Sequence, residues 1–153
     1  MKEITGKINA EGMKFAIVVS RFNSFFTEQL LKGATDCFLR HEGADQNLTT
    51  VRIPGANEAP VVVSKLTASG SYDAVIVLGA VIQGATPHAD LINGTVARAV
   101  SNIALKSGIP VINGIVCAQN LEQAIERSGT KQGNKGWDAV MTAIETVAVM
   151  KNL

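Results

Sequence analysis

The sequence predicts an α/β protein in which a four-stranded parallel sheet lies between two layers of helices. Three observations point to it: four short apolar runs have the composition of buried strands, segments of helical periodicity separate them, and glycine or proline follows several of these segments. With 153 residues, of which 46% are apolar and 18% charged, the chain is expected to fold as a single domain spanning 1–153.

Each expected strand is a short apolar run rich in β-branched residues, which is typical of strands covered on both faces of a parallel sheet. The clearest is AVIVL, in which every residue is apolar. The shortest run, Val51–Ile53, is the weakest indication of a strand, and the run Val111–Cys117 contains an asparagine and a glycine. The four strands are expected at Phe15–Val19, Val51–Ile53, Ala74–Leu78 and Val111–Cys117.

Helices are expected between and after these strands, because apolar residues recur there at spacings of three and four. Gly43 is expected to end the first helix in the left-handed conformation. The alternation of strands and helices implies right-handed crossovers, which place helices on both faces of the sheet. The helices are expected from Phe26 to about His41, over Glu58–Ser69, from about Ala89 to Ser107, after a capping box of Asn120 and Gln123, and from about Trp137 to Met150.

The charge pattern and the apolar pattern exclude several classes of partner. The formal net charge is +1 and no basic run is longer than two residues, so nucleic acid is not expected as a partner. No apolar run is long enough to span a membrane, and Met1–Ala10 lacks the pattern of a signal peptide. A cytoplasmic protein is therefore expected.

Known cofactor and metal motifs are absent from the sequence. Neither GxGxxG nor GxxxxGK[ST] occurs, and the histidines and cysteines lack the spacing of a metal site. Cys37 and Cys117 lie far apart within apolar stretches, and we expect both to be buried free thiols in a reducing compartment.

The candidate site follows the strands, because ligands of open parallel sheets bind outside the carboxyl ends of the strands. After the third strand, Gly84, Ala85 and Thr86 are small enough for backbone N–H groups to approach a phosphate at the start of a helix. The same residues would equally form a simple glycine turn. The segments that follow the strands are 21–23, 54–58, 79–88 and 118–120.

Several side chains near these segments have the chemistry of a site, and each also has a structural explanation. His88, at a helix start, is expected to stay neutral and suits proton transfer, although capping or packing would also explain it. Arg127 and Lys135 suit phosphate but would also suit a solvated surface. Phe22 either stacks on a flat heterocycle or closes the core, and Glu58 is stabilised at a helix start with or without a ligand.

Four segments together closely resemble the lumazine synthase (6,7-dimethyl-8-ribityllumazine synthase) family. They are RFN at 21–23, PGANE at 54–58, GAVIQGATPH at 79–88 and EQAIERSGTKQGNKG at 122–136. The resemblance implies a flavodoxin-like fold and a riboflavin-pathway transferase that acts on small-molecule substrates. This enzyme condenses 5-amino-6-ribitylaminouracil with 3,4-dihydroxy-2-butanone 4-phosphate, releasing phosphate and water, without a metal or an organic cofactor.

The resemblance also implies roles for individual residues. His88 matches the residue that transfers protons. The residues that match or occupy the aminouracil and ribityl positions are Phe22, Ala56, Asn57, Glu58, Ala80, Val81, Ile82, Asn113 and Lys135, and those that match the phosphate site are Ala85, Thr86 and Arg127.

The chain departs from the family pattern at Asn57 and Asn113, where family members commonly carry aromatic residues, and at Gln83 and Ala89. Losing aromatic surfaces weakens substrate contacts, since a stacked pair adds about 0.5–1.5 kcal/mol beyond burial. One alternative is therefore a shell-forming homologue with impaired catalysis. Another is an unrelated phosphate-binding or flavin-binding module, although its usual acidic cluster or Ser/Thr-rich loop is replaced here by RFN.

Assembly is expected from the first residues, because Met1–Ala10 is strand-like but has too few apolar residues to be stable alone. In the family this strand joins a neighbouring subunit's sheet within a pentamer, and the pocket lies between neighbours. The short loop at 129–136 resembles that of members whose pentamers form icosahedral shells of sixty subunits. The resemblance thus implies such a shell, with a free pentamer as the main alternative.

Overall fold

The computed structural model describes residues 1–84, 88–129 and 133–153, which contain four strands, five α-helices and two short 3₁₀ turns. The strands are β1 (Phe15–Ser20), β2 (Leu48–Ile53), β3 (Ala74–Ile82) and β4 (Val111–Ala118). The helices are α1 (Ser24–Arg40), α2 (Ala59–Ala68), α3 (His88–Ser107), α4 (Leu121–Arg127) and α5 (Lys135–Lys151), and the 3₁₀ turns are η1 (Asp45–Asn47) and η2 (Ala56–Glu58).

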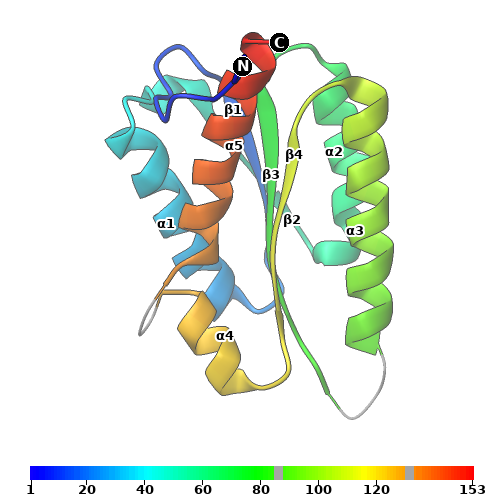
Figure 1. The fold of residues 1–153 in the computed structure, drawn as a ribbon. Coiled ribbons are helices and arrows are strands. Elements are labelled where there is room, and N and C mark those ends of the chain that lie inside the picture. Colours follow the sequence, from blue (N-terminus) through cyan, green and yellow to red (C-terminus); the bar gives the residue numbers. More distant parts are fainter. Residues whose placement is uncertain (85–87, 130–132) are drawn as a thin grey trace.

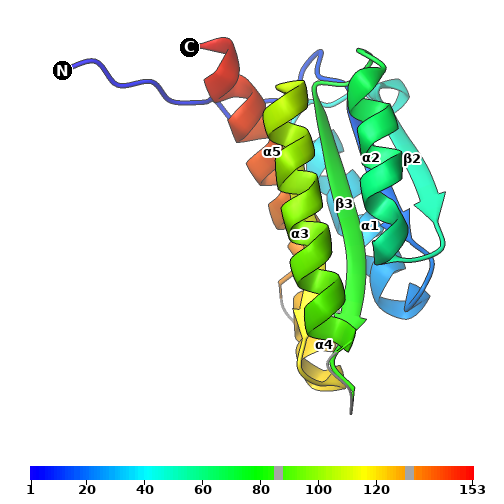
Figure 2. The same cartoon turned by 90° about the vertical axis from the view of Figure 1, so that its right-hand side faces the viewer.

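The four strands form one parallel sheet in the order β2-β1-β3-β4. Helices α1, α4 and α5 cover one face of the sheet, and α2 and α3 cover the other (Figure 1). Figure 2 shows α2 and α3 side by side over this second face. The strand order is that of flavodoxin-like folds, so the predicted three-layer sandwich is confirmed.

The central strands are buried on both faces, which explains their continuously apolar sequences. In β1, Phe15, Ile17 and Val19 belong to the core beneath α1 and α5, whereas Ala16 and Val18 belong to the core beneath α2 and α3. Successive side chains of a strand point to opposite faces, so each face of this strand needs its own apolar set.

Two strands are longer than the sequence predicts. The edge strand β2 begins at Leu48 rather than Val51, because its polar residues pair with β1 through the backbone and leave their side chains exposed. The central strand β3 continues past Leu78 to Ile82, because β4 runs beside it as far as the pair of Ile82 with Ala118. Residues 80–82, expected in a loop, therefore end a strand.

The first helix stops near the predicted position but by a different turn. Glu42, with φ 70°, adopts the left-handed conformation that was expected of Gly43. Gly43 is small for another reason, since a Cβ there would collide with the ring of Phe38. The prediction of a left-handed glycine was therefore wrong.

Asparagines cap both helices that follow β4. Oδ1 of Asn120 accepts the N–H of Gln123 at 2.9 Å, which confirms the predicted cap, while Gln123 Oε1 accepts the N–H of Gln119 at 2.9 Å. Helix α5 begins earlier than expected because Oδ1 of Asn134 accepts the N–H of Trp137 at 3.0 Å.

The two cysteines lie in different environments. Cys37 is buried, and burial together with the charges of Asp36 and Asp138 raises its pKa to about 12. Cys117 is exposed, so the expectation that both thiols are buried was wrong for it. The reason is that β4 is an edge strand with an uncovered side.

The first ten residues form no strand within the described chain, and Figure 2 shows them leading away from the sheet. The carbonyl of Thr5 accepts a hydrogen bond from Asn152 Nδ2 at 2.9 Å, and the N–H of Ala10 donates to the carbonyl of His41 at 2.7 Å. The pairing of residues 1–10 with the sheet of a neighbouring subunit stays a prediction. Of the helices in the described ranges, none combines the length and apolar character needed to cross a bilayer.

Candidate active site

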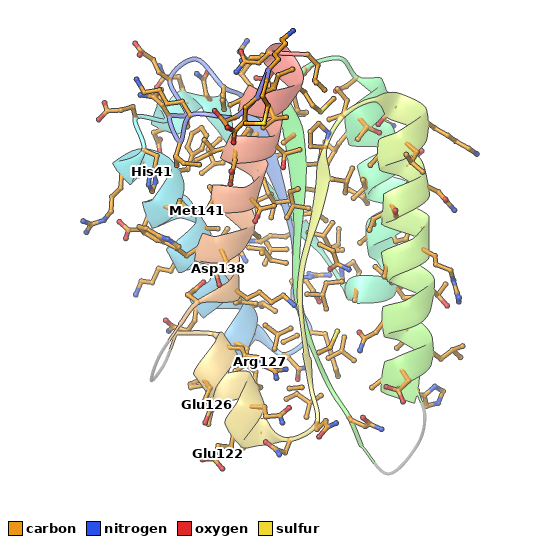
Figure 3. All side chains as sticks on the ribbon, viewed as in Figure 1. His41, Glu122, Glu126, Arg127, Asp138 and Met141 are labelled. Carbon is orange, nitrogen blue, oxygen red and sulfur yellow. The ribbon has the colours of Figure 1, made fainter. Side chains whose placement is uncertain are left out.

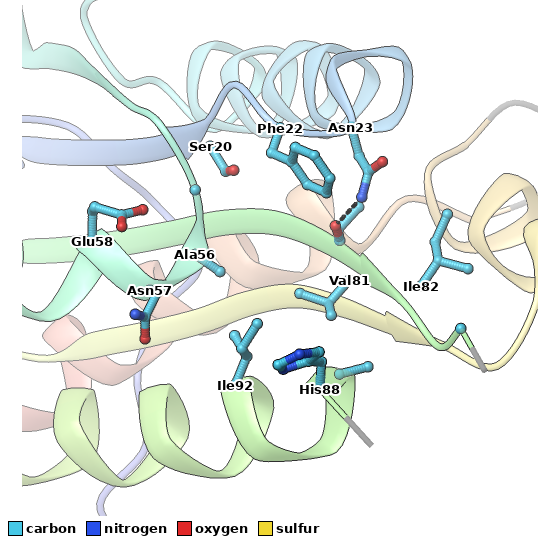
Figure 4. A pocket seen from close by; sticks show the side chains of 14 residues that line it. Ser20, Phe22, Asn23, Ala56, Asn57, Glu58, Val81, Ile82, His88 and Ile92 are labelled. Carbon is cyan, nitrogen blue, oxygen red and sulfur yellow. Dashed lines mark hydrogen bonds between the residues drawn. The ribbon is translucent and has the colours of Figure 1, made fainter. Parts of the chain in front are cut away.

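A pocket of about 480 Å³ opens at the carboxyl ends of β1, β2 and β3, between the sheet, the turn η2 and the first turns of α3 (Figure 4). This is the edge of the sheet at which the sequence predicts the site. The pocket brings together most of the expected side chains: Phe22, Ala56, Asn57, Glu58, Ala80, Val81, Ile82, Gly84 and His88.

Phe22 is held at the pocket by the turn that follows β1. The N–H groups of Arg21 and Phe22 donate to the carbonyls of Ile53 and Pro54, at 2.8 and 3.0 Å, so this turn is tied to the end of β2. The Phe22 side chain is 71% exposed. An exposed aromatic ring beside a pocket is available to stack on a flat ligand.

Asn23 fixes the same turn to β3. Its φ of 60° is left-handed, a conformation that asparagine tolerates better than most residues. Its Nδ2 donates to the carbonyl of Ala80 at 2.7 Å, the dashed bond in Figure 4. Asn23 lines the pocket but was not predicted as a site residue, although the RFN segment could have pointed to it.

The turn after β2 supplies a polar part of the pocket wall. The N–H of Glu58 donates to the carbonyl of Gly55 at 3.2 Å, which forms the 3₁₀ turn η2. A Cβ on Gly55 would lie 3.1 Å from Glu58 Oε2, so glycine leaves room for this carboxylate. The side chains of Asn57 and Glu58 are exposed, and their polar atoms are therefore accessible to ligand hydroxyls.

His88 is the first residue of α3, as the sequence predicts, and its exposed ring faces the pocket. Ile92 lies one turn further along α3 and also lines the pocket (Figure 4). Sequence reasoning missed Ile92, although its spacing from His88 places both on one helix face. Ala85 and Thr86, expected to bind phosphate, lie outside the described residues.

Three expected site residues do not line this pocket. Asn113 is exposed on the edge strand β4, and its Oδ1 accepts the N–H of Ile115 at 3.0 Å. Arg127 is the last residue of α4, and Figure 3 shows it across the sheet from α3. Lys135 begins α5. Within a single chain, these three residues are therefore not part of the pocket.

Arg127 and Lys135, which we call the cation pair, stand at the end of α4 and at the start of α5, on either side of the connection between these helices. Arg127 Nη1 donates to the carbonyl of Cys117 at 2.8 Å. Although Cys117 is exposed, its thiol is partly desolvated by neighbouring groups, which raises its pKa, and the positive charges of Lys135 and Arg127 oppose this rise. No lysine or arginine is among the described residues that line the pocket.

The pocket offers an aromatic face, an amide, a carboxylate and an imidazole, which suit the positioning of a polar ring and the transfer of protons. Over residues 1–84, 88–129 and 133–153, no three side chains of His, Cys, Asp or Glu gather as metal ligands.

The family model described as 6,7-dimethyl-8-ribityllumazine synthase matches residues 12–151. A protein of Chlorobium luteolum named 6,7-dimethyl-8-ribityllumazine synthase is 46% identical over 153 residues, which cover 100% of this chain and 99% of that protein. Both matches include the pocket and the cation pair, and they overturn the alternative of an unrelated binding module. The chain belongs to the 6,7-dimethyl-8-ribityllumazine synthase family.

Proposed function

We propose that this protein catalyses the condensation of 5-amino-6-ribitylaminouracil with 3,4-dihydroxy-2-butanone 4-phosphate to 6,7-dimethyl-8-ribityllumazine, a transferase reaction of riboflavin biosynthesis. Family membership supports this activity. The single observation that carries it is the pocket that combines Phe22, Glu58 and His88 at the carboxyl ends of parallel strands.

The reaction joins two nitrogens of the uracil to the four-carbon phosphate. The 5-amino nitrogen attacks the ketone, and loss of water gives a Schiff base. Removal of a carbon-bound proton and departure of phosphate break the C–O bond, and the resulting enol becomes a ketone. The ribitylamino nitrogen then closes the ring on this ketone with loss of a second water. Each step requires alignment and proton transfer rather than an external oxidant or reductant.

The residues that line the pocket have different roles in this reaction. The exposed ring of Phe22 stacks on the pyrimidine, and Ala56, Asn57 and Glu58 bind the ribityl hydroxyls. His88 transfers protons from its position at the start of α3. The wall against the pyrimidine is the end of β3, formed by Ala80, Val81 and Ile82.

Phosphate binding is assigned to the segment before α3 and to Arg127. Gly84 lines the pocket, and the amino terminus of a long helix attracts an anion. Ala85 and Thr86, which complete this segment, keep the role that the resemblance implies. The guanidinium of Arg127 offers a fork for two phosphate oxygens.

A second copy of the chain completes the site in this proposal. Within one chain the pocket has no described lysine or arginine in its lining, and helices α4 and α5, which carry Arg127 and Lys135, cover the face of the sheet opposite α3 (Figure 1). Asn113 is exposed on β4, an edge strand that offers a surface to a neighbour. A neighbour's β4 edge placed over the pocket would bring Asn113, Arg127 and Lys135 to the substrates.

We expect the assembly to be a pentamer within an icosahedral shell of sixty subunits, because the connection at 129–136 is short. Met1–Ala10 is expected to join the sheet of a neighbouring subunit. Light scattering with negative-stain microscopy tests both the pentamer and the shell. A monodisperse monomer would contradict the shared site, whereas a stable pentamer would contradict only the shell.

Replacing Asn57 and Asn113 with phenylalanine is expected to tighten aminouracil binding by about two- to tenfold for each change, the equivalent of about 0.5–1.5 kcal/mol of stacking. The effects are expected to be non-additive, because both rings would meet the same ligand. Calorimetry on the single and double variants measures this. Weaker binding by the double variant would show that the pocket is adapted to asparagine.

The activity is tested by mixing the purified protein with both substrates and following lumazine absorbance. We expect a rate well above that of the uncatalysed condensation in the same buffer. A matched reaction with 3-hydroxy-2-butanone, which lacks the phosphate leaving group, is expected to form no lumazine. A rate equal to the protein-free control would contradict the proposed activity.

A further inference from the structure

Asn134 joins three segments of the chain through one side-chain amide. Its Nδ2 donates to the carbonyl of Gln29 in α1 at 2.9 Å and to the carbonyl of Ser128 after α4 at 3.1 Å. Its Oδ1 accepts the N–H of Trp137 in the first turn of α5 at 3.0 Å. A helix cap needs only the last of these bonds.

The surrounding backbone leaves room for this amide. A Cβ on Gly33 or on Gly129 would collide with the Asn134 side chain. Ser128 is fully buried and forms an isolated antiparallel bridge with Asn134. Because the amide is packed between these segments, loss of its bonds would free the segments to move relative to one another.

In the sequence, Asn134 lies between Arg127 and Lys135, the two members of the cation pair. Ser128 follows Arg127 in the chain and Lys135 follows Asn134, so the bond from Asn134 to Ser128 ties together the neighbours of both cations. Arg127 also donates to the carbonyl of Cys117 at 2.8 Å, and the charges of both cations act on the Cys117 thiol.

We propose that Asn134 is a positioning residue that fixes Arg127 and Lys135 relative to each other, so that the phosphate and the aminouracil are bound at a constant separation. The inference rests on the proposed function, in which Arg127 binds the phosphate and Lys135 the aminouracil. Asn134 is half-buried and does not line the pocket, so it acts through these neighbours.

Three variants separate this role from that of a helix cap. Asn134→Ser keeps a capping oxygen and a neutral side chain but loses the two bonds from Nδ2, and Asn134→Ala loses all three bonds. Asn120→Ala is the matched control, because Asn120 caps the neighbouring helix α4 by accepting the N–H of Gln123 at 2.9 Å. Each assembled protein is assayed for kcat, for KM of both substrates, for Kd of inorganic phosphate and for Tm.

Asn134→Ser is expected to raise the KM for both substrates and the Kd for phosphate about tenfold, because small displacements of binding groups weaken both contacts. Arg127→Ala is expected to raise only the phosphate constants. Asn120→Ala is expected to lower Tm and to leave the binding constants unchanged. Gly33→Ala, which intrudes on the amide while keeping Asn134, is expected to reproduce the effect of Asn134→Ser.

Wild-type constants in Asn134→Ser, or equal losses in Asn120→Ala, would show that Asn134 is only a helix cap. A rise confined to one substrate would contradict the coupling of the two cations. The phosphate measurement does not depend on turnover. A wild-type protein that binds phosphate without making lumazine would therefore overturn the proposed activity, whereas an unchanged phosphate Kd in Asn134→Ser would overturn this inference.

Discussion

Replacing His88 with alanine is expected to lower kcat by about 10²-fold and to leave the Kd for inorganic phosphate unchanged. The imidazole is exposed in the pocket, at the first residue of α3. An imidazole can take a proton from one atom and return it to another. Some activity is expected to remain, because the amine and the ketone react once they are aligned.

The second histidine of the chain provides the control. His41 caps the far end of α1, where Nδ1 lies 2.6 Å from the carbonyl of Cys37 and the ring meets Trp137 edge-on at 5.8 Å. His41→Asn is expected to leave kcat unchanged. Steady-state rates with both substrates saturating measure the two variants. An unchanged kcat in His88→Ala would remove His88 from the mechanism.

Replacing Arg127 with alanine is expected to raise the Kd for inorganic phosphate at least tenfold, since a charge-assisted hydrogen bond contributes about 1.5–3 kcal/mol. The guanidinium is already oriented, because Nη1 donates to the carbonyl of Cys117 at 2.8 Å. Calorimetry at low ionic strength measures the change, and added salt is expected to narrow the difference between the two proteins.

Arg40→Ala is the matched control for this loss of a guanidinium. Arg40 lies on α1, its Nε bonds Asp36 at 2.9 Å, and its side chain is 70% exposed. Removing the Arg40 side chain is expected to leave the phosphate Kd unchanged, because an exposed ion pair contributes little to the stability of the fold. An equal Kd for wild type and Arg127→Ala would show that phosphate binds elsewhere.

The layers of the fold could be predicted because β1 and β3 are covered on both faces and therefore have continuously apolar sequences. The length of β3 could not, since its last residues are in a strand only because β4 pairs with them. The exposure of Cys117 likewise depends on β4 being at an edge, which a local sequence pattern does not encode.

Much of the pocket could be predicted because Phe22 and Glu58 follow strands and His88 begins a helix. Asn23 was missed because its site position depends on a left-handed turn and on a bond to the carbonyl of Ala80, a tertiary contact. The separation of Arg127 from the pocket within one chain could not be derived from its motif alone, because a local motif does not state where the end of α4 lies relative to the start of α3.

Co-assembly of His88→Ala chains with Arg127→Ala chains tests most directly whether one chain supplies the pocket and its neighbour the cation pair. The two variants are co-expressed with different tags, and mixed assemblies are purified through both tags. With equal mixing, about a quarter of the junctions join an intact pocket to an intact cation pair. At a concentration of the phosphate substrate far below its KM for Arg127→Ala, lumazine formation is then expected to recover to about that fraction of the wild-type rate, above the rate of either variant alone. If a single chain supplies both halves, every site in the mixture carries one defect, and a rate no higher than the average of the two variants would contradict the shared site.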